Sequence, residues 1–268
     1  MSEIPEIRVG LVFGAGGPTG GPFIHAALGE LARHTGWTAP AATSIVGTSA
    51  GAFVAAAVDP TPLATTHEQL RAFADLDNGQ DFAAGLHHVA VARVRLVVGS
   101  AIARFAPKAR PIAAYDVAAA PYHQGASVVT VQRSTARRRI HRLSSGTNVR
   151  AVVRASAAIP WVNGPIDVTG ALHVDGALHS VANADVVDIE DHDALIVIAP
   201  MVPRAGGSVA ERTHRAQLRA ELAPWLRTEK PTIVITPNEI EHRDRRNRKL
   251  FELAGEHAMK RLTSSGDL

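Results

Sequence analysis

The chain has 268 residues, of which 46% are hydrophobic, 20% are charged and 4% are aromatic, and its formal net charge at pH 7 is +3. This apolar fraction excludes an intrinsically disordered chain, because it supplies enough side chains for a sizeable core. The modest charge and scarce aromatic side chains argue against a nucleic-acid partner, and the lack of cysteine excludes disulfides, a thiol nucleophile and cysteine-ligated zinc.

The first sixty residues alternate between apolar runs and loops of small residues. Residues 7–13 form a largely apolar run typical of a buried strand, and a glycine-rich loop over residues 14–21 follows it. An apolar stripe at helical spacing over residues 23–31 predicts a helix that ends at Gly36. A second β-branched run then leads into an alanine-rich helix over residues 44–57. This order predicts parallel strands joined by helices, the beginning of an α/β sheet.

The second strand and its helix are joined by Gly47-Thr48-Ser49-Ala50-Gly51. This GxSxG pattern has the form of a nucleophile elbow, in which a strained turn presents the serine at the start of a helix. A side chain at Gly47 or Gly51 is expected to collide where the strand and the helix cross. The pentapeptide alone also fits a plain strand-to-helix turn, so a nucleophilic Ser49 needs support from the rest of the chain.

Residues 61–124 carry two helical patterns, one beginning after Thr66 and one over residues 89–105. Prolines interrupt the part that follows. After an elbow, such a segment is either a lid or cap inserted over the site or an ordinary helical layer. The sequence leaves both interpretations open.

The second half of the chain again alternates strands and helices. Strands are predicted at 127–132, 138–143, 193–198 and 232–235, and residues 168–176 are expected to contain another short strand around a turn at Gly170. Helices are predicted at 149–158, 211–226 and 238–262. No repeat or low-complexity linker divides the chain, so residues 1–268 are expected to form a single domain. The basic stretch over residues 133–142 is either a solvated hairpin or a contact to anionic lipid head groups.

No apolar window approaches the length of a membrane span, and the run over residues 9–13 is too short for the core of a signal peptide. We therefore expect a soluble, cytoplasmic protein, with peripheral docking on membrane surfaces as an additional option. Nothing in the sequence indicates an oligomeric state.

The glycine-rich loop allows three interpretations. A dinucleotide fingerprint counted from Gly14 requires glycine where Thr19 stands, and a phosphate-binding loop requires lysine where Pro22 stands. The third interpretation is an oxyanion hole, in which the N–H groups of Gly16 and Gly17 face the charge that develops when a serine attacks an ester. The elbow on a neighbouring parallel strand supplies such a serine, because both loops lie at the carboxyl edge of the sheet.

Ser49 also requires a base. Histidines in the second half of the chain are the candidates for a conventional triad: His173, His179, His214, His242 and His257. Two of these histidines flank Asp175-Gly176, a dipeptide that by itself usually marks a turn.

Four blocks in this order resemble the patatin-like phospholipase family. The blocks are Ala15-Gly16-Gly17-Pro18-Thr19-Gly20, Gly47-Thr48-Ser49-Ala50-Gly51, Arg154-Ala155-Ser156-Ala157-Ala158-Ile159-Pro160 and Asp175-Gly176-Ala177. The resemblance covers most of the chain and leaves the middle segment and the last third unmatched. It implies a three-layer α/β/α domain with a mainly parallel central sheet.

The resemblance also implies a serine acyl hydrolase that acts on a lipid or a small acyl ester. It would be of the phospholipase A, lipid acyl hydrolase or carboxylesterase type, and it would use no metal and no cofactor. Ser49 would be the nucleophile that forms an acyl-enzyme, and Asp175 the base. Gly16 and Gly17 would donate to the oxyanion, with the Ala50 N–H as a further donor. The remaining motif glycines are Gly20, Gly47, Gly51 and Gly176.

The chain departs from the family pattern at three places. Ala15 replaces the first glycine of the donor motif, Thr19 stands where lysine or arginine is common, and Asn183-Ala184-Asp185 lacks the proline of an Asn-x-Pro sequence. Ala15 and Thr19 leave a second hypothesis, a weakly active or inactive patatin-like protein that binds lipid or a protein partner. A third hypothesis is an α/β-hydrolase with a late histidine, although an elbow so near the N-terminus argues against it.

Overall fold

The computed structural model describes residues 6–83, 88–105, 117, 121–144 and 146–264. Across these residues, eight strands form one sheet in the order β5-β6-β3-β2-β1-β7-β8, and β4 pairs with β3. The strands are β1 Val9–Phe13, β2 Ser44–Thr48, β3 Ala126–Gln132, β4 Arg137–Arg142, β5 Ile166–Val168, β6 Ala171–Asp175, β7 Ala194–Ile198 and β8 Thr232–Ile235. The five strands from β3 to β8 along this order are mutually parallel, and β4, β5 and β6 join by antiparallel pairing.

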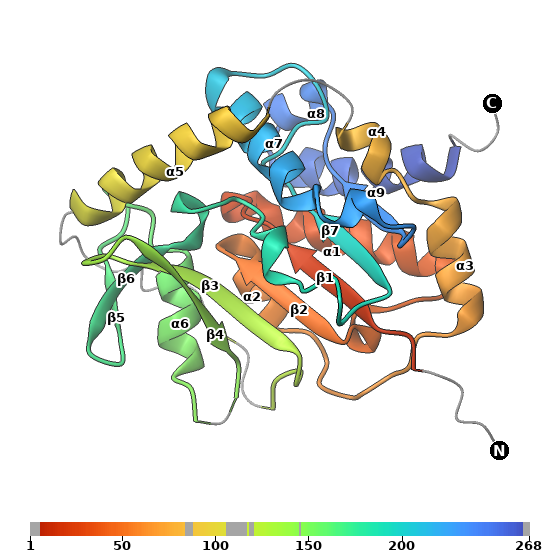
Figure 1. Ribbon diagram of the computed structural model, residues 1–268, viewed down its shortest axis with the longest axis horizontal. Coiled ribbons are helices and arrows are strands. Elements are labelled where there is room, and N and C mark those ends of the chain that lie inside the picture. The colour runs from red at the N-terminus through yellow and green to blue at the C-terminus, as the bar shows by residue number, and fades with distance from the viewer. Residues whose placement is uncertain (1–5, 84–87, 106–116, 118–120, 145, 265–268) are drawn as a thin grey trace.

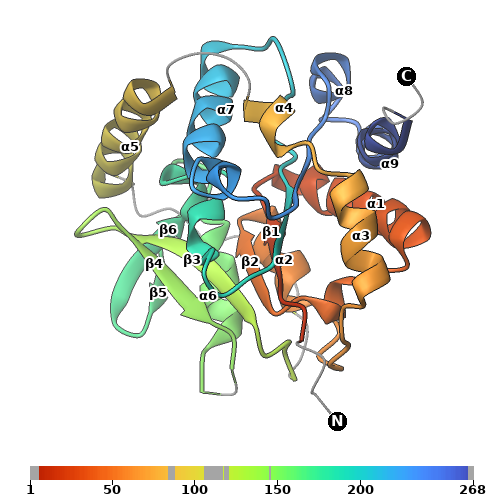
Figure 2. The same cartoon turned by 45° about the vertical axis from the view of Figure 1, so that its right-hand side comes forward.

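Helices cover both faces of this sheet (Figure 1 and Figure 2). The α-helices are α1 Gly17–Thr35, α2 Ala50–Ala56, α3 His67–Asp75, α4 Gly79–Ala83, α5 His88–Phe105, α6 Val149–Ser156, α7 Val209–Leu222, α8 Glu239–Arg243 and α9 Arg248–Ser264. Short 3-10 turns are η1 Ala39–Ala41, η2 Gly176–Leu178, η3 Ala184–Val186 and η4 Trp225–Arg227.

The two largest hydrophobic clusters of the described residues lie on opposite faces of the sheet, because successive side chains of a strand point to opposite faces. On β1, Leu11 belongs to the core that α1 and α9 cover, whereas Val12 belongs to the core that α7 covers. Both side chains are fully buried. Strands β1 and β7 are accordingly apolar along their whole length, as is typical of parallel strands covered on both faces. The predicted three-layer α/β/α fold with a mainly parallel sheet is confirmed.

The predicted helices of the middle segment are present as α3 and α5. Thr66 caps α3, because its hydroxyl accepts a hydrogen bond from the N–H of Gln69 at 3.2 Å. Helix α5 runs beside α7 (Figure 1), and at Gly99 its backbone approaches Leu178. The predicted lid or cap over residues 61–124 falls partly outside the described residues.

The prediction of one helix over residues 238–262 is wrong. The chain forms α8 and α9, which are separated by a turn at residues 244–247. The N–H of Asn247 donates to the carbonyl oxygen of Asp244 at 2.8 Å, which closes the turn. The side chain of Asn247 then accepts the N–H of Leu250 at 3.2 Å, as an N-cap does at the start of a new helix. Arg245 and Arg246 lie in this turn, and both line the cavity that is described below.

The two other helices predicted in this half have slightly different ends. Ser208 begins α7 with a capping box that includes Glu211, and α6 ends at Ser156 instead of continuing to 158. Among the described residues, no helix combines the length and the apolar composition that crossing a bilayer requires.

Candidate active site

The candidate site lies where two strands end against the same edge of β3. Strand β4 occupies one edge of β3, so β2 and β6 share the other. They approach from opposite directions: Thr48, the last residue of β2, pairs with Val129, and Asp175, the last residue of β6, pairs with Thr130. The residue that follows β2 is Ser49. This arrangement brings Ser49 and Asp175 together, although 126 positions separate them in the chain.

Ser49 has the backbone geometry of a strained elbow. Its φ of 54° and ψ of −116° are unusual for a residue with a side chain, and such conformations persist only where the surroundings enforce them. The crossing of β2 and α2 is tight, because a Cβ at Gly47 would lie 2.6 Å from the carbonyl oxygen of Gly51. A Cβ at Gly51 would overlap the carbonyl group of Phe13 on β1. The glycines of the pentapeptide are therefore required by packing, as predicted.

The side chains of Ser49 and Asp175 are in direct contact. The Ser49 hydroxyl donates to Oδ2 of Asp175 at 2.9 Å. The other carboxylate oxygen, Oδ1, accepts the N–H of Ala177 at 2.8 Å, and the Asp175 N–H donates to the carbonyl oxygen of Ala158 at 3.0 Å. Both residues are buried. The carboxylate is thus held in place from two sides and aimed at the serine, which is the geometry that a general base requires.

The glycine-rich loop presents two backbone donors to the site. The N–H groups of Gly14 and Ala15 donate to Ile198 and Val181 respectively. Those of Gly16 and Gly17 meet no hydrogen-bond acceptor among the described residues. Gly17 has a φ of +59°, which favours glycine, and a Cβ there would meet open space. Two unsatisfied N–H groups at the start of α1 can therefore receive a developing negative charge.

The loop contacts the elbow directly. A Cβ at Gly20 would lie 3.0 Å from the Cβ of Ala50, and a Cβ at Gly16 would overlap Gly20 itself. Ala15, the first departure from the family pattern, is only 2% exposed and packs in the core that α7 covers, and it also lines the cavity over the site. At Gly176, close approach also excludes a side chain, because a Cβ there would overlap the carbonyl group of Val129.

A cavity of about 520 Å³ opens over these groups. Its lining consists of Ala15, Gly16, Gly17, Pro18, Thr19, Ser49, Ile159, Pro160, Asp175, Ala177, Leu178, Val181, Met201, His214, Arg245 and Arg246. Ser49, Asp175, Gly16 and Gly17 therefore share one cavity, and Ala50 is not among the residues that line it. Most of the lining is apolar, and its cations come from the turn between α8 and α9.

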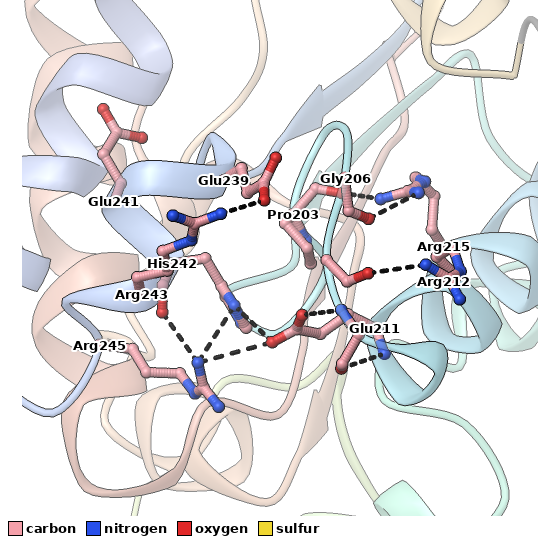
Figure 3. A network of polar contacts seen from close by, with 12 residues as sticks. Pro203, Gly206, Glu211, Arg212, Arg215, Glu239, Glu241, His242, Arg243 and Arg245 are labelled. Atoms are coloured by element: carbon pink, nitrogen blue, oxygen red, sulfur yellow. Dashed lines mark hydrogen bonds and ion pairs between the residues drawn. The ribbon is translucent and has the colours of Figure 1, made fainter.

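Thr19, the second departure, connects the loop to that turn. Its hydroxyl donates to the backbone carbonyl oxygen of Arg245 at 2.5 Å. The Arg245 guanidinium in turn donates to the carbonyl oxygen of His242 at 3.0 Å and lies 3.5 Å from Oε1 of Glu211 (Figure 3). Burial, followed by the neighbouring Arg245, lowers the pKa of His242, although Glu211 opposes this. Residues far apart in the sequence thus support the glycine loop from one side.

Asn183 supports the site from the other side. Its side-chain amide donates to Oγ1 of Thr48 at 3.1 Å and to the carbonyl oxygen of Ser180 at 2.7 Å. Asn183 is fully buried and has a φ of 58°, a conformation that asparagine tolerates better than most residues. The segment after Asp175 is therefore tied to the elbow without the proline of the family pattern.

The candidate triad histidines are dispersed around the site. His214 lines the cavity. The ring of His173 bonds to Oγ1 of Thr130 at 2.7 Å, and burial, together with the nearby His141 and Arg139, lowers its pKa to about 4. The other three are held elsewhere. His179 accepts a bond from Gln217 through its carbonyl oxygen, His242 pairs with Glu211, and the exposed His257 lies near Glu241.

The basic stretch over residues 133–142 lies in the turn after β3 and in β4, and part of it is engaged within the chain. Arg138 pairs with Asp185 through two hydrogen bonds of 2.6 and 2.8 Å, and Arg139 bonds to the side chain of Gln132.

In the described part of the chain, no group of three or more histidine, aspartate or glutamate side chains converges as a metal site would.

Sequence reasoning missed two features of the site. Ser156 bonds to the Ser49 backbone, and Arg245 and Arg246 line the cavity. Ser156 lies inside one of the four motif blocks, but its partner is determined by tertiary packing. The arginines were hidden by the prediction of an unbroken final helix, and Asn247, a good N-cap residue, was the available signal for the break.

Comparisons with known proteins identify a family. A family model described as patatin-like phospholipase matches residues 11–188. No curated protein sequence matches the chain. Among solved structures, the crystal structure of VipD from Legionella pneumophila aligns with a TM-score of 0.45 and 11% sequence identity, and the alignment covers 97% of this chain and 67% of that chain. This likeness is too distant to carry an argument about activity.

Proposed function

The chain belongs to the patatin-like phospholipase family, and on that premise we propose that it is a serine acyl hydrolase with a Ser49–Asp175 dyad. At a general level, the family supports the hydrolysis of lipid acyl esters. The observation that carries the finer proposal is the 2.9 Å hydrogen bond from the Ser49 hydroxyl to the Asp175 carboxylate, inside a largely apolar cavity. No metal or cofactor takes part in the proposed reaction.

In the first half of the reaction, Oγ of Ser49 attacks the carbonyl carbon of the ester while Asp175 takes the hydroxyl proton. The carbonyl oxygen becomes an oxyanion that accepts hydrogen bonds from the N–H groups of Gly16 and Gly17, with Ala50 as a further donor at the start of α2. The bond to the alcohol oxygen then breaks, and Asp175 returns the proton to the leaving alcohol. An acyl group remains on Ser49.

In the second half of the reaction, water hydrolyses the acyl-enzyme. Asp175 takes a proton from water as its oxygen attacks the acyl carbonyl carbon, and the same backbone donors stabilise the second oxyanion. When the bond to Oγ breaks, the proton returns to Ser49 and the fatty acid leaves as its carboxylate after losing its own proton to solvent. One carboxylate thus acts alternately as base and acid.

The surroundings of the cavity support a lipid substrate and contact with a lipid surface. Ile159 lines the cavity, and the nearby Trp161 and Val162 are 62% and 65% exposed. Exposed aromatic and aliphatic side chains beside a site entrance suit insertion at a membrane interface. We include in the proposal peripheral contact with membranes from the cytoplasmic side, because a cysteine-free chain suits a reducing compartment.

We also assign all 268 residues to one acyl hydrolase domain. The last helix, α9, packs on the first, α1, where the rings of Phe23 and Phe251 lie 5.0 Å apart. The part of the chain beyond the family match therefore completes the same core.

A fluorophosphonate probe tests the proposal, because it labels only an activated serine. We expect the folded protein to be labelled at Ser49 and to release p-nitrophenol from p-nitrophenyl butyrate, and the Ser49→Ala variant to do neither. A folded protein without labelling would refute the dyad. Binding of lipid without any ester turnover would instead favour the weakly active binding protein.

A further inference from the structure

The turn between α8 and α9 adds positive charge to the cavity. Arg245 and Arg246 lie in this turn, and both line the cavity that contains Ser49 and Asp175. The glycine loop itself carries no cation, because Thr19 stands where a basic residue is common in the family. The cavity therefore obtains its arginines from a distant segment, and the two arginines differ in what they contact.

The Arg245 side chain makes structural contacts within the protein. Its guanidinium is bonded to the His242 carbonyl oxygen and lies beside the carboxylate of Glu211, which compensates its charge (Figure 3). Its backbone carbonyl oxygen accepts the Thr19 hydroxyl. Arg245 thus anchors the turn against the glycine loop and holds the next residue at the cavity wall.

Arg246 differs from Arg245 in its contacts. It is exposed, and among the described residues it forms neither a hydrogen bond nor an ion pair. The remaining charged side chain in the cavity, Asp175, is engaged with Ser49. A guanidinium with a free fork of donors at the edge of a cavity is suited to a phosphate or carboxylate group.

Much of the cavity lining is apolar and includes Ile159, Leu178, Val181 and Met201. It suits an acyl chain, because burial of CH₂ groups against apolar side chains is favourable. A cavity with an apolar wall, a nucleophile and an unpaired cation matches an amphiphile whose anionic group lies near the scissile ester.

We infer that Arg246 is a specificity-determining residue that binds the anionic group of the substrate, so that turnover favours acyl esters bearing a phosphate over neutral esters with the same acyl chain. The inference rests on the proposed function and deepens it. A charge-assisted contact of this kind corresponds to a factor of about ten or more in kcat/KM.

Two substrates with one acyl chain test the inference: 1-decanoylglycerol 3-phosphate and 1-decanoylglycerol, each below its micelle concentration. We expect the wild type to favour the phosphate ester, and Arg246→Gln to reduce the ratio of the two kcat/KM values by about tenfold or more. Arg248→Gln is the matched control, because this exposed arginine does not line the cavity. An unchanged ratio in Arg246→Gln, or a wild-type preference for the neutral ester, would overturn the inference.

A binding experiment separates this inference from the proposed function. In the Ser49→Ala background, decyl phosphate and inorganic phosphate are titrated against proteins with and without Arg246→Gln. Tight binding of decyl phosphate that weakens about tenfold in the variant supports an anionic amphiphile. Equal binding of both ligands indicates a free phosphate as the source of the anion. Binding that is insensitive to Arg246 refutes the inference even if the esters are hydrolysed.

Discussion

The Ser156 hydroxyl accepts a hydrogen bond from the backbone N–H of Ser49 at 2.9 Å and donates its own proton to the carbonyl oxygen of Val129 at 2.7 Å. Ser156 is fully buried, so both bonds are sheltered from water. It thereby joins the elbow to the strand against which β2 and β6 end. Because this bond occupies the Ser49 N–H, the oxyanion must be stabilised by other donors, which agrees with the free N–H groups of Gly16 and Gly17.

Replacing Ser156 with alanine is predicted to weaken both the elbow and the fold. The change leaves the Ser49 N–H and the Val129 carbonyl buried without a partner, at a cost of roughly 1–3 kcal/mol each. We expect a fall in the free energy of unfolding and a fall in kcat larger than the change in KM, because the nucleophile loses its position. Denaturant unfolding and steady-state kinetics measure both, with the exposed Ser144→Ala as the control. An unchanged kcat would show that the bond does not position Ser49.

Asp175→Asn is predicted to reduce turnover by about two orders of magnitude or more, because an amide cannot take the Ser49 proton. The side chain keeps its size, so the unfolding transition should change little. His214→Ala is the informative companion, since His214 lines the same cavity. Retention of activity in His214→Ala together with its loss in Asp175→Asn supports the dyad. The reverse pattern would favour a histidine-dependent hydrolase.

Gly17→Ala is predicted to lower kcat by at least about tenfold, because alanine at a φ of +59° strains the loop and displaces its donors. Gly21→Ala provides a matched control four residues later. A Cβ at Gly21 meets open space within α1, so alanine should raise stability by about 0.5–1 kcal/mol and leave turnover unchanged. Steady-state kinetics and thermal unfolding of the two variants distinguish an effect of the altered loop backbone on kcat from a general effect of replacing glycine with alanine. Equal kinetics in the two variants would contradict the role of Gly17.

Stability is predicted to fall as pH rises through the acid range because of Glu221. Burial, followed by the nearby Asp185, raises the pKa of this carboxyl to about 7. Between its unfolded pKa of about 4.5 and pH 7, the folded state binds more protons than the unfolded state, so deprotonation destabilises the fold. Above about pH 7 the loss is complete, on the order of a few kcal/mol.

Glu221→Gln should remove this loss, since the amide oxygen still accepts the N–H of Ala184, which bonds to Glu221 at 2.9 Å. Relative to the wild type, the variant should gain stability between pH 5 and pH 8 in denaturant unfolding. Glu252→Gln, an exposed position on α9, serves as the control. A stability difference that does not change with pH would rule out titration of Glu221.

Local sequence patterns were sufficient to predict most elements. The apolar runs of β1, β2 and β7, the end of α1 at Gly36 and the cap at Thr66 follow from periodicity and backbone chemistry within a few neighbouring residues. The close crossing at Gly47 and Gly51 was also predictable, because it belongs to one continuous strand-turn-helix unit. The sequence by itself therefore determined the fold class and identified the elbow.

Tertiary structure decided which distant residues meet. Strand β6 pairs with the part of the shared edge of β3 that β2 leaves unpaired. This pairing is set by packing across the whole sheet, and it brings Asp175 to Ser49. The break at residues 244–247 likewise depends on a turn held against Thr19, so it places Arg246 at the cavity wall. Such contacts form because they stabilise the core as a whole, and this stabilisation cannot be inferred from any short stretch of the sequence.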